Sequence, residues 1–180
     1  MKNLKTLTTV FVSASLLAGS AYAQENPKLS DPEVAHVAVV ANQIDIAYAA
    51  IAKEKSKDAD ILKFAETMTN DHNAVITQAS ALVKKLNVTP KENSVSQKLL
   101  ADAEQTKKSL RAKSGKEFNK AYIDNEVAYH KTVNSALSTT LIPDAQNSEL
   151  KSLLQNGLKV FEDASGARGA SGSATALSES

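Results

Sequence analysis

Apolar positions recur along the chain at alternating steps of three and four residues, the period of an α-helix that buries one face. The pattern is longest between residues 58 and 86, where each member follows the previous one by four or three positions. Its members are Ile61, Ala65, Met68, His72, Val75, Ala79, Leu82 and Leu86. Because this spacing keeps a single stripe facing a partner, it predicts a helix over 58–86 that packs along its whole length.

Four further helices follow from the same spacing and from capping sequences at their starts. The first carries a stripe from Val34 to Ile51 and opens with Ser30-Asp31-Pro32-Glu33, in which Glu33 is placed to reach back to the backbone of Ser30. A tight reversal at residues 56–58 leads into the second helix, and Pro143 is expected to end the fourth. The predicted helices span residues 31–55, 58–86, 94–113, 115–141 and 147–165.

The other caps are expected in the short polar segments between the helices. Ser56 or Asp58 is placed to cap the second helix, and capping boxes at Ser94 to Gln97 and Ser114 to Glu117 begin the third and fourth. The stripe of the fourth helix is predicted to contain Phe118, Tyr122, Ile123, Val127, His130, Val133 and Leu137. The last helix is predicted to bury Leu150, Leu153, Leu154, Leu158 and Phe161.

No strand-like alternation of polar and apolar residues, no glycine-rich phosphate loop and no Gly-x-Ser-x-Gly motif occurs in the sequence. We therefore expect an all-α protein. The reversal at 56–58 makes the first two helices an antiparallel hairpin, and the fourth and fifth helices form a second one. Two hairpins joined by a crossing segment are typical of a ferritin-like four-helix bundle, with the third, more polar helix as a shorter accessory crossover helix.

The start of the chain has the features of a signal peptide. Residues 1–23 combine a basic beginning, an apolar core from Leu7 to Leu17, and Ala21-Tyr22-Ala23 before the predicted cleavage point. We therefore expect a periplasmic or extracellular protein, with a short linker over 24–29. Ser20 stands where a lipoprotein needs cysteine, so no lipid anchor is expected, and no later stretch is expected to span a membrane.

Composition limits the partners and the chemistry of the exported chain. Without the signal, Lys and Arg fall from 21 to 19 against 20 Asp and Glu, a net charge of −1 that gives little attraction to nucleic acid. The chain has no cysteine, which excludes disulfides and thiolate metal sites. The 157 residues that remain of 180 suit one domain, predicted over 30–165. Residues 166–180 are rich in Gly, Ala and Ser and are predicted to be a disordered tail.

Several acidic and histidine side chains are expected to point into the bundle. They are Asp45, Glu66, Asp71, His72, Glu126, His130 and Glu162. In the predicted hairpin Asp45 lies level with Met68, about 6 Å along the axis from His72. Glu126 and His130 are one helical turn apart on a single face, so both can contact one ligand. We therefore consider Asp45, His72, Glu126 and His130 as candidate ligands of a divalent metal ion such as iron, manganese or zinc.

A purely structural interpretation of these residues stays open. Di-iron and di-manganese bundles use a Glu-x-x-His motif on two helices, and neither His72 nor His130 has a glutamate three positions before it. As a core residue, His72 is expected to be buried and to hydrogen-bond a carboxylate or tyrosine of another helix. His36, one position off the apolar stripe, is expected to be exposed. Three tyrosines either hydrogen-bond the carboxylates or pack in the core, namely Tyr48, Tyr122 and Tyr129.

The most specific local motif is Phe64-Ala65-x-x-Met68-x-x-Asp71-His72. It accompanies Asp31 with Val34, Asp45 with Ala52, and Phe118-x-x-x-Tyr122-Ile123-x-x-x-Val127-x-x-His130. Together these residues resemble the bacterial family called domain of unknown function 4142, from about Asp31 to Ala164. The resemblance implies an exported four-helix protein of ferritin-like fold, often described as an outer-membrane protein, with no settled activity. Asp45 stands where that family usually has glutamate, and Ala164-Ser165 stands near the place of its His-Leu pair.

Two interpretations of function follow. The first is a non-enzymatic exported bundle that acts as a binding or envelope-stress module, with an exposed helix face that recognises a protein or envelope partner. A complete core and a complete set of caps favour it, and no serine has a base and an orienting acid at a recognisable spacing. The second is a degenerate ferritin-like metal-binding protein that uses Asp45, His72, Glu126 and His130. The first requires no cofactor, whereas the second requires a divalent metal ion.

Overall fold

The computed structural model describes residues 28–159 and 161, and this part of the chain is helical apart from short connections. The signal peptide over 1–23, residues 24–27 of the linker and the tail over 166–180 lie outside the described residues. No strand occurs in the described part, which confirms the all-α prediction. The elements are α1 (Asp31–Lys55), α2 (Ala59–Lys85), α3 (Ser94–Arg111), α4 (Gly115–Ala136), the π-helical turn η1 (Leu137–Leu141), the short α5 (Ile142–Asp144) and a last helix over 148–159.

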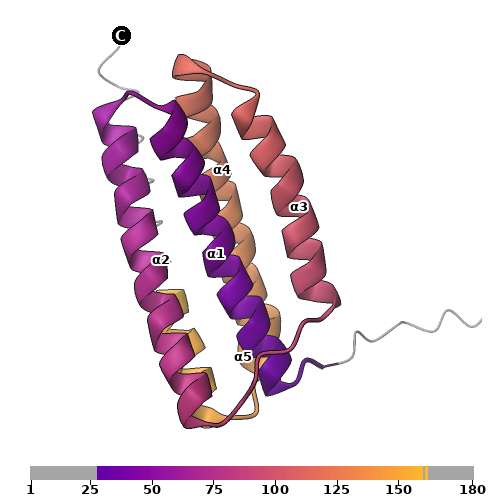
Figure 1. Cartoon of the computed structure of the whole chain (residues 1–180). Helices are drawn as coiled ribbons and strands as arrows, with labels where there is room; N and C mark the ends of the chain where they lie inside the picture. The colour runs from indigo at the N-terminus through magenta and orange to yellow at the C-terminus, as the bar shows by residue number, and fades with distance from the viewer. Residues whose placement is uncertain (1–27, 160, 162–180) are drawn as a thin grey trace, which may run out of the picture.

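α1 is the central helix of the bundle. Figure 1 shows α2 and α3 on either side of it with α4 behind, and α1 packs against all three. Twelve of its 25 residues are buried, so it presents apolar side chains in several directions rather than along one stripe. By length and composition alone α1 is apolar enough to cross a membrane, a property not expected from the sequence. Since 61% of that apolar window is buried inside the bundle, α1 is built as a core helix.

Local sequence explains where α1 and α2 begin and end. The predicted capping box forms at Ser30, whose backbone N–H donates to Glu33 Oε2 at 3.0 Å. Asp58 caps α2, because its Oδ1 accepts from the backbone N–H of Asp60 at 3.0 Å. After α2 the chain turns at Asn87, whose φ of 54° is a left-handed conformation that asparagine tolerates. The cap of Asp58 therefore fixes the turn of the hairpin formed by α1 and α2, and the left-handed backbone of Asn87 allows the turn that follows α2.

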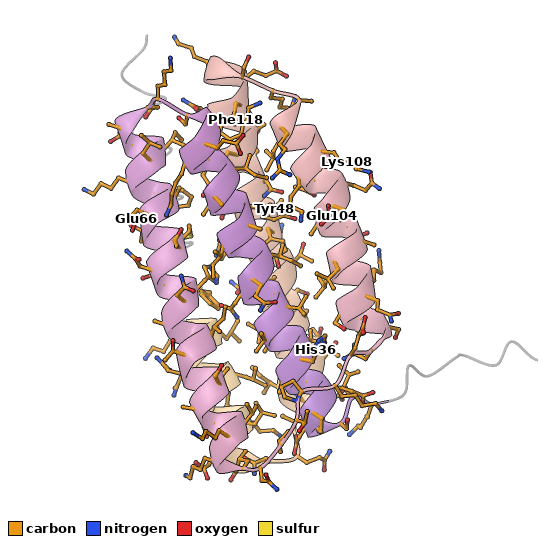
Figure 2. All side chains as sticks on the ribbon, viewed as in Figure 1. His36, Tyr48, Glu66, Glu104, Lys108 and Phe118 are labelled. Carbon is orange, nitrogen blue, oxygen red and sulfur yellow. The ribbon has the colours of Figure 1, made fainter. Side chains whose placement is uncertain are left out.

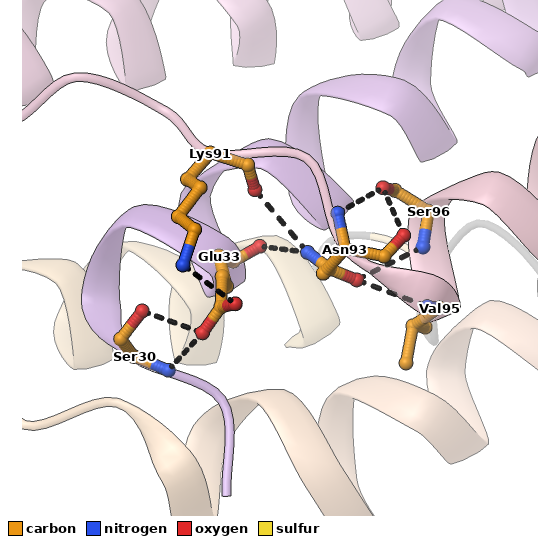
Figure 3. Close-up of polar contacts among 6 residues, drawn as sticks. All are labelled: Ser30, Glu33, Lys91, Asn93, Val95 and Ser96. Atoms are coloured by element: carbon orange, nitrogen blue, oxygen red, sulfur yellow. Dashed lines mark hydrogen bonds and ion pairs between the residues drawn. The ribbon is translucent and has the colours of Figure 1, made fainter.

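The start of α3 is tied to the start of α1 (Figure 3). Asn93, one residue before the predicted Ser94, caps α3, because its Oδ1 accepts from the backbone N–H of Val95 at 3.0 Å. The side-chain amide of Asn93 also donates to the carbonyl of Glu33 at 3.2 Å. Lys91 Nζ lies 3.5 Å from Glu33 Oε1. These contacts hold the connection after α2 across the beginning of α1 and direct α3 along the opposite side of α1.

The fourth helix continues past Pro143 instead of ending before it. Leu137–Leu141 form a π-helical turn in which the N–H of Ile142 donates to the carbonyl of Leu137, and α5 then carries Pro143. A proline lacks an N–H and its ring crowds the carbonyl four residues earlier, which normally breaks an α-helix. Here the backbone hydrogen bonds already join residues five positions apart, so the chain accommodates Pro143 and continues for one helical turn beyond the predicted end at residue 141.

Buried apolar side chains form two clusters, one toward each end of the bundle. The first contains Phe118, labelled in Figure 2, and Tyr122, both fully buried on α4. The second joins the beginning of α1 to η1 and the last helix. Val127 was predicted to lie in the buried stripe and is instead 61% exposed, because it stands about 100° around the helix from the buried Glu126.

Candidate metal centre

A layer of polar side chains separates the two apolar clusters. The helices α1, α2 and α4 each contribute to it where they pass from one cluster to the other. Each of the residues in this layer is at most 7% exposed, so their polar atoms must find partners among one another rather than in water. The layer consists of Asn42, Asp45, His72, Glu126 and His130.

A single carboxylate oxygen is the meeting point of the layer. Asp45 Oδ2 lies 3.4 Å from His72 Nε2 and 3.5 Å from His130 Nε2. One ligand atom from each of the three residues lies within 4.8 Å of the other two, a separation that a shared metal ion can span. The axial offset of about 6 Å expected between Asp45 and His72 in an ideal hairpin is therefore closed by the length of the side chains and by the packing of the helices.

Asn42 orients the ring of His72. Its Oδ1 lies 2.7 Å from His72 Nδ1, while its Nδ2 donates to the carbonyl of Ala38 at 2.8 Å, which fixes the direction of the amide. Because an amide oxygen only accepts, Nδ1 carries a proton, and Nε2 is the ring nitrogen that faces Asp45. His72 is buried as predicted, but the partner of Nδ1 is an amide rather than a carboxylate or tyrosine. Asn42 could have been found, since it stands three residues before Asp45 on the same helix face.

His130 is oriented by its own helix. Its Nδ1 lies 2.9 Å from the backbone carbonyl of Glu126, which also only accepts, so Nδ1 again carries the proton and Nε2 faces Asp45. The carboxylate of Glu126 is 3.9 Å from the same Nδ1. Glu126 is therefore buried beside the site, as the sequence suggested, but on the side of the ring that points away from Asp45. It belongs to the surroundings that orient a ligand rather than to the ligand atoms themselves.

Phe161 covers the two imidazoles from the last helix. Its ring stacks on His72 with centroids 5.0 Å apart and planes 15° apart, and meets His130 edge-on at 5.9 Å. Phe161 also lines a cavity of about 10 Å³, together with Ala41, Val133, Tyr129 and every residue of the polar layer except Glu126. A space of this size holds about one water-sized atom. That space is thus too small for any larger molecule in this conformation.

Tyr129 packs beside the site without joining the carboxylates. Its hydroxyl donates to the carbonyl of Ala41 at 2.9 Å, and its ring meets that of Tyr48 edge-on at 5.4 Å. Burial raises the pKa of Tyr129 strongly, and the negative charges of Asp45 and Glu126 raise it further. Burial also raises the pKa of Tyr48. Both phenols therefore stay protonated at neutral pH.

Other candidate residues lie away from this site. Glu66 is exposed, projects from the outer face of α2 in Figure 2 and pairs with Lys53 at 2.7 Å. Asp71 is exposed as well, so the expectation that both acids point inward was wrong; each stands next to a buried residue and is turned about 100° from it. His36 is half-buried rather than exposed, and its buried Nδ1 has no hydrogen-bond partner among the described residues. Glu162 lies outside the described residues.

Comparison with known families agrees with the motif around His72. The family model described as Domain of unknown function (DUF4142) matches residues 17–167. The chain belongs to this family. No curated protein and no solved structure matches it. Because the DUF4142 description assigns no activity, the function of this DUF4142 protein has to be inferred from the side chains of the buried layer.

Proposed function

We propose that this DUF4142 protein binds one divalent transition-metal ion through Asp45, His72 and His130. The orientation of the imidazoles is the observation that supports this most. Both Nε2 atoms face one carboxylate oxygen, while the Nδ1 protons are held by Asn42 and by the carbonyl of Glu126. With both rings neutral, three electron-pair donors face one another and repel, and a cation between them converts the repulsion into attraction.

A structural polar layer is the competing explanation. Protons on the two Nε2 atoms would take the place of the ion and give a His-Asp-His arrangement of ion pairs. The contacts of the two Nδ1 atoms favour metal binding, because metal-binding histidines almost always donate their other N–H to a carbonyl, amide or carboxylate oxygen. His72 and His130 both do so, through partners fixed by the backbone.

An exported, ferritin-like setting is part of the same proposal. Carboxylates and imidazoles that project inward from facing helices are the way helical bundles hold metal ions, and the sequence pattern of residues 1–23 supports the periplasm or the exterior. The small closed cavity has no room for an organic substrate. We therefore propose binding rather than catalysis, with the ion holding α1, α2 and α4 together and an exposed helix face recognising a protein or envelope partner.

Metal content and thermal unfolding test this proposal. The purified protein should retain about one equivalent of zinc, iron or manganese after dialysis, measured by elemental analysis. An ion at 100 times its dissociation constant should add about 2.7 kcal/mol to the free energy of unfolding. Asp45→Asn and His72→Ala should abolish the retention and the stabilisation, whereas the control Glu66→Gln, at an exposed acid of α2, should change neither. If no ion is retained and none shifts the melting curve, the layer is structural and the proposal is wrong.

A further inference from the structure

The spacing of the ligand atoms carries information about coordination number. For metal–ligand bonds of about 2.1 Å, neighbouring ligands are about 3.4 Å apart in a tetrahedron and about 3.0 Å apart in an octahedron. The two separations from Asp45 Oδ2 to His72 Nε2 and His130 Nε2 are 3.4 and 3.5 Å. One ligand atom from each of the three residues lies within 4.8 Å of the other two. The two separations from the carboxylate oxygen thus match a tetrahedral edge before an ion enters, whereas an octahedral ion with Asp45 Oδ2 next to both nitrogens requires both separations to contract.

The fourth position of such a tetrahedron has only one place to lie. The carboxylate of Glu126 lies 3.9 Å from Nδ1 of His130, whereas the ion faces Nε2, and Glu126 is not part of the group whose ligand atoms lie within 4.8 Å of one another. The cavity of about 10 Å³ beneath Phe161 adjoins all three ligand residues and accepts about one water-sized atom. Phe161 limits that space, because its ring stacks directly on His72.

We infer that the ion is four-coordinate, that zinc is the metal suited to it, and that one water-sized ligand occupies its fourth position under Phe161. This inference rests on the proposed metal binding and adds the geometry, the preferred ion and the size of the exchangeable ligand. Zinc takes tetrahedral sites of histidine and carboxylate ligands, whereas magnesium and manganese prefer six oxygen-rich positions. Three protein ligands and one water are the ligand count of an open zinc site, but here the Phe161 ring stacks on His72 and the adjoining space admits only about one water-sized atom.

Cobalt(II) substitution is the test, because four-coordinate cobalt(II) absorbs visible light much more strongly than six-coordinate cobalt(II). The metal-free protein is loaded with one equivalent of cobalt, and its spectrum is recorded alone and with azide or imidazole. We expect the intense bands of a four-coordinate ion, unchanged by either reagent. In Phe161→Ala, which enlarges the cavity, both reagents should shift the bands. Phe161→Leu, which keeps much of the volume, should behave as the parent protein, and so should the control Glu66→Gln, at an exposed acid of α2.

The possible outcomes distinguish four-coordinate geometry from the proposed metal binding on which it rests. Weak bands with cobalt bound would overturn four-coordinate geometry and leave metal binding intact. A shift of the parent spectrum by imidazole, or no shift in a folded Phe161→Ala variant, would overturn the closed fourth position. Failure of cobalt, zinc, iron and manganese to bind at all would overturn the metal proposal itself. Far-UV circular dichroism of each variant establishes that it is folded.

Discussion

Replacement of His72 in the metal-free protein isolates the structural cost of the buried layer. His72 is 4% exposed, hydrogen-bonds Asn42 through Nδ1 and stacks on Phe161. His72→Ala removes the stacking and leaves Asn42 Oδ1 buried without a donor. His72→Leu also removes the donor but keeps most of the side-chain volume against Phe161. The two variants therefore differ mainly in packing, and their difference measures it.

The magnitudes follow from the contacts. Loss of an aromatic stacking contact costs about 0.5–1.5 kcal/mol, and a buried acceptor left without its donor costs about 1–3 kcal/mol. His72→Ala should therefore lower the free energy of unfolding by about 2–4 kcal/mol, and His72→Leu, which loses the donor but little packing, by about 1–3 kcal/mol and by less than His72→Ala. The double variant Asn42→Leu, His72→Leu removes both partners of the hydrogen bond. It should recover most of the loss of the single leucine variant, because paired apolar replacement is nearly neutral.

Thermal unfolding in the presence of a chelator, followed by far-UV circular dichroism, measures these differences. For a domain of this size the melting temperature should fall by about 3 °C for each kcal/mol lost. Urea unfolding gives the same comparison at one temperature, and adding the single variant Asn42→Leu to the parent, His72→Leu and the double variant completes a double-mutant cycle between Asn42 and His72. If His72→Ala and His72→Leu are both as stable as the parent, His72 is not packed as described, and the orientation argument for the metal site fails with it.

Two predictions concern other parts of the bundle. Burial raises the pKa of Tyr129 in the folded state, so above about pH 10 this tyrosine ionises in the unfolded chain first, and the free energy of unfolding should fall as pH rises from there. Tyr129→Phe should reduce this fall with pH, measured by urea unfolding. An unchanged slope would refute the raised pKa of Tyr129. Asp58→Ala should lower the free energy of unfolding by about 1 kcal/mol, because α2 loses its cap. Asp58→Asn keeps the accepting oxygen and should lower the free energy of unfolding by less. Equal losses in the two variants would mean that this cap does not stabilise the protein.

The helices were predictable because local sequence decides where they begin. Asp58 and Glu33 cap their helices through neighbours two or three residues away, and no distant residue has to be known. The direction of a polar side chain on a helix is a different problem. Glu126 and Val127 are adjacent and differ by about 100° around α4, and the core accepts the charged one because Asp45, His72 and His130 already make that level of the bundle polar. A prediction from hydropathy alone therefore places Val127, and not Glu126, in the buried stripe.

The site itself was only partly predictable, for reasons of rotamer and register. Asp45, His72 and His130 were found because polar residues on a buried face need partners. Which nitrogen of each ring faces the carboxylate depends on Asn42 and on a backbone carbonyl, and no spacing rule contains that choice. The passage of the helix through Pro143 was missed for a similar reason, since a π turn changes the backbone pairing without a clear mark in the sequence.

The central position of α1 has a consequence for the chain as it is being made. α1 leaves the ribosome before every helix that covers it, and the last of them, over 148–159, follows after more than half of the chain has been synthesised. Until then its apolar faces, sufficient in length and composition for a membrane span, are covered only in part. A segment that is well protected in the finished bundle is therefore prone to misassociation in the nascent chain, which makes it a natural target of a chaperone that holds apolar segments.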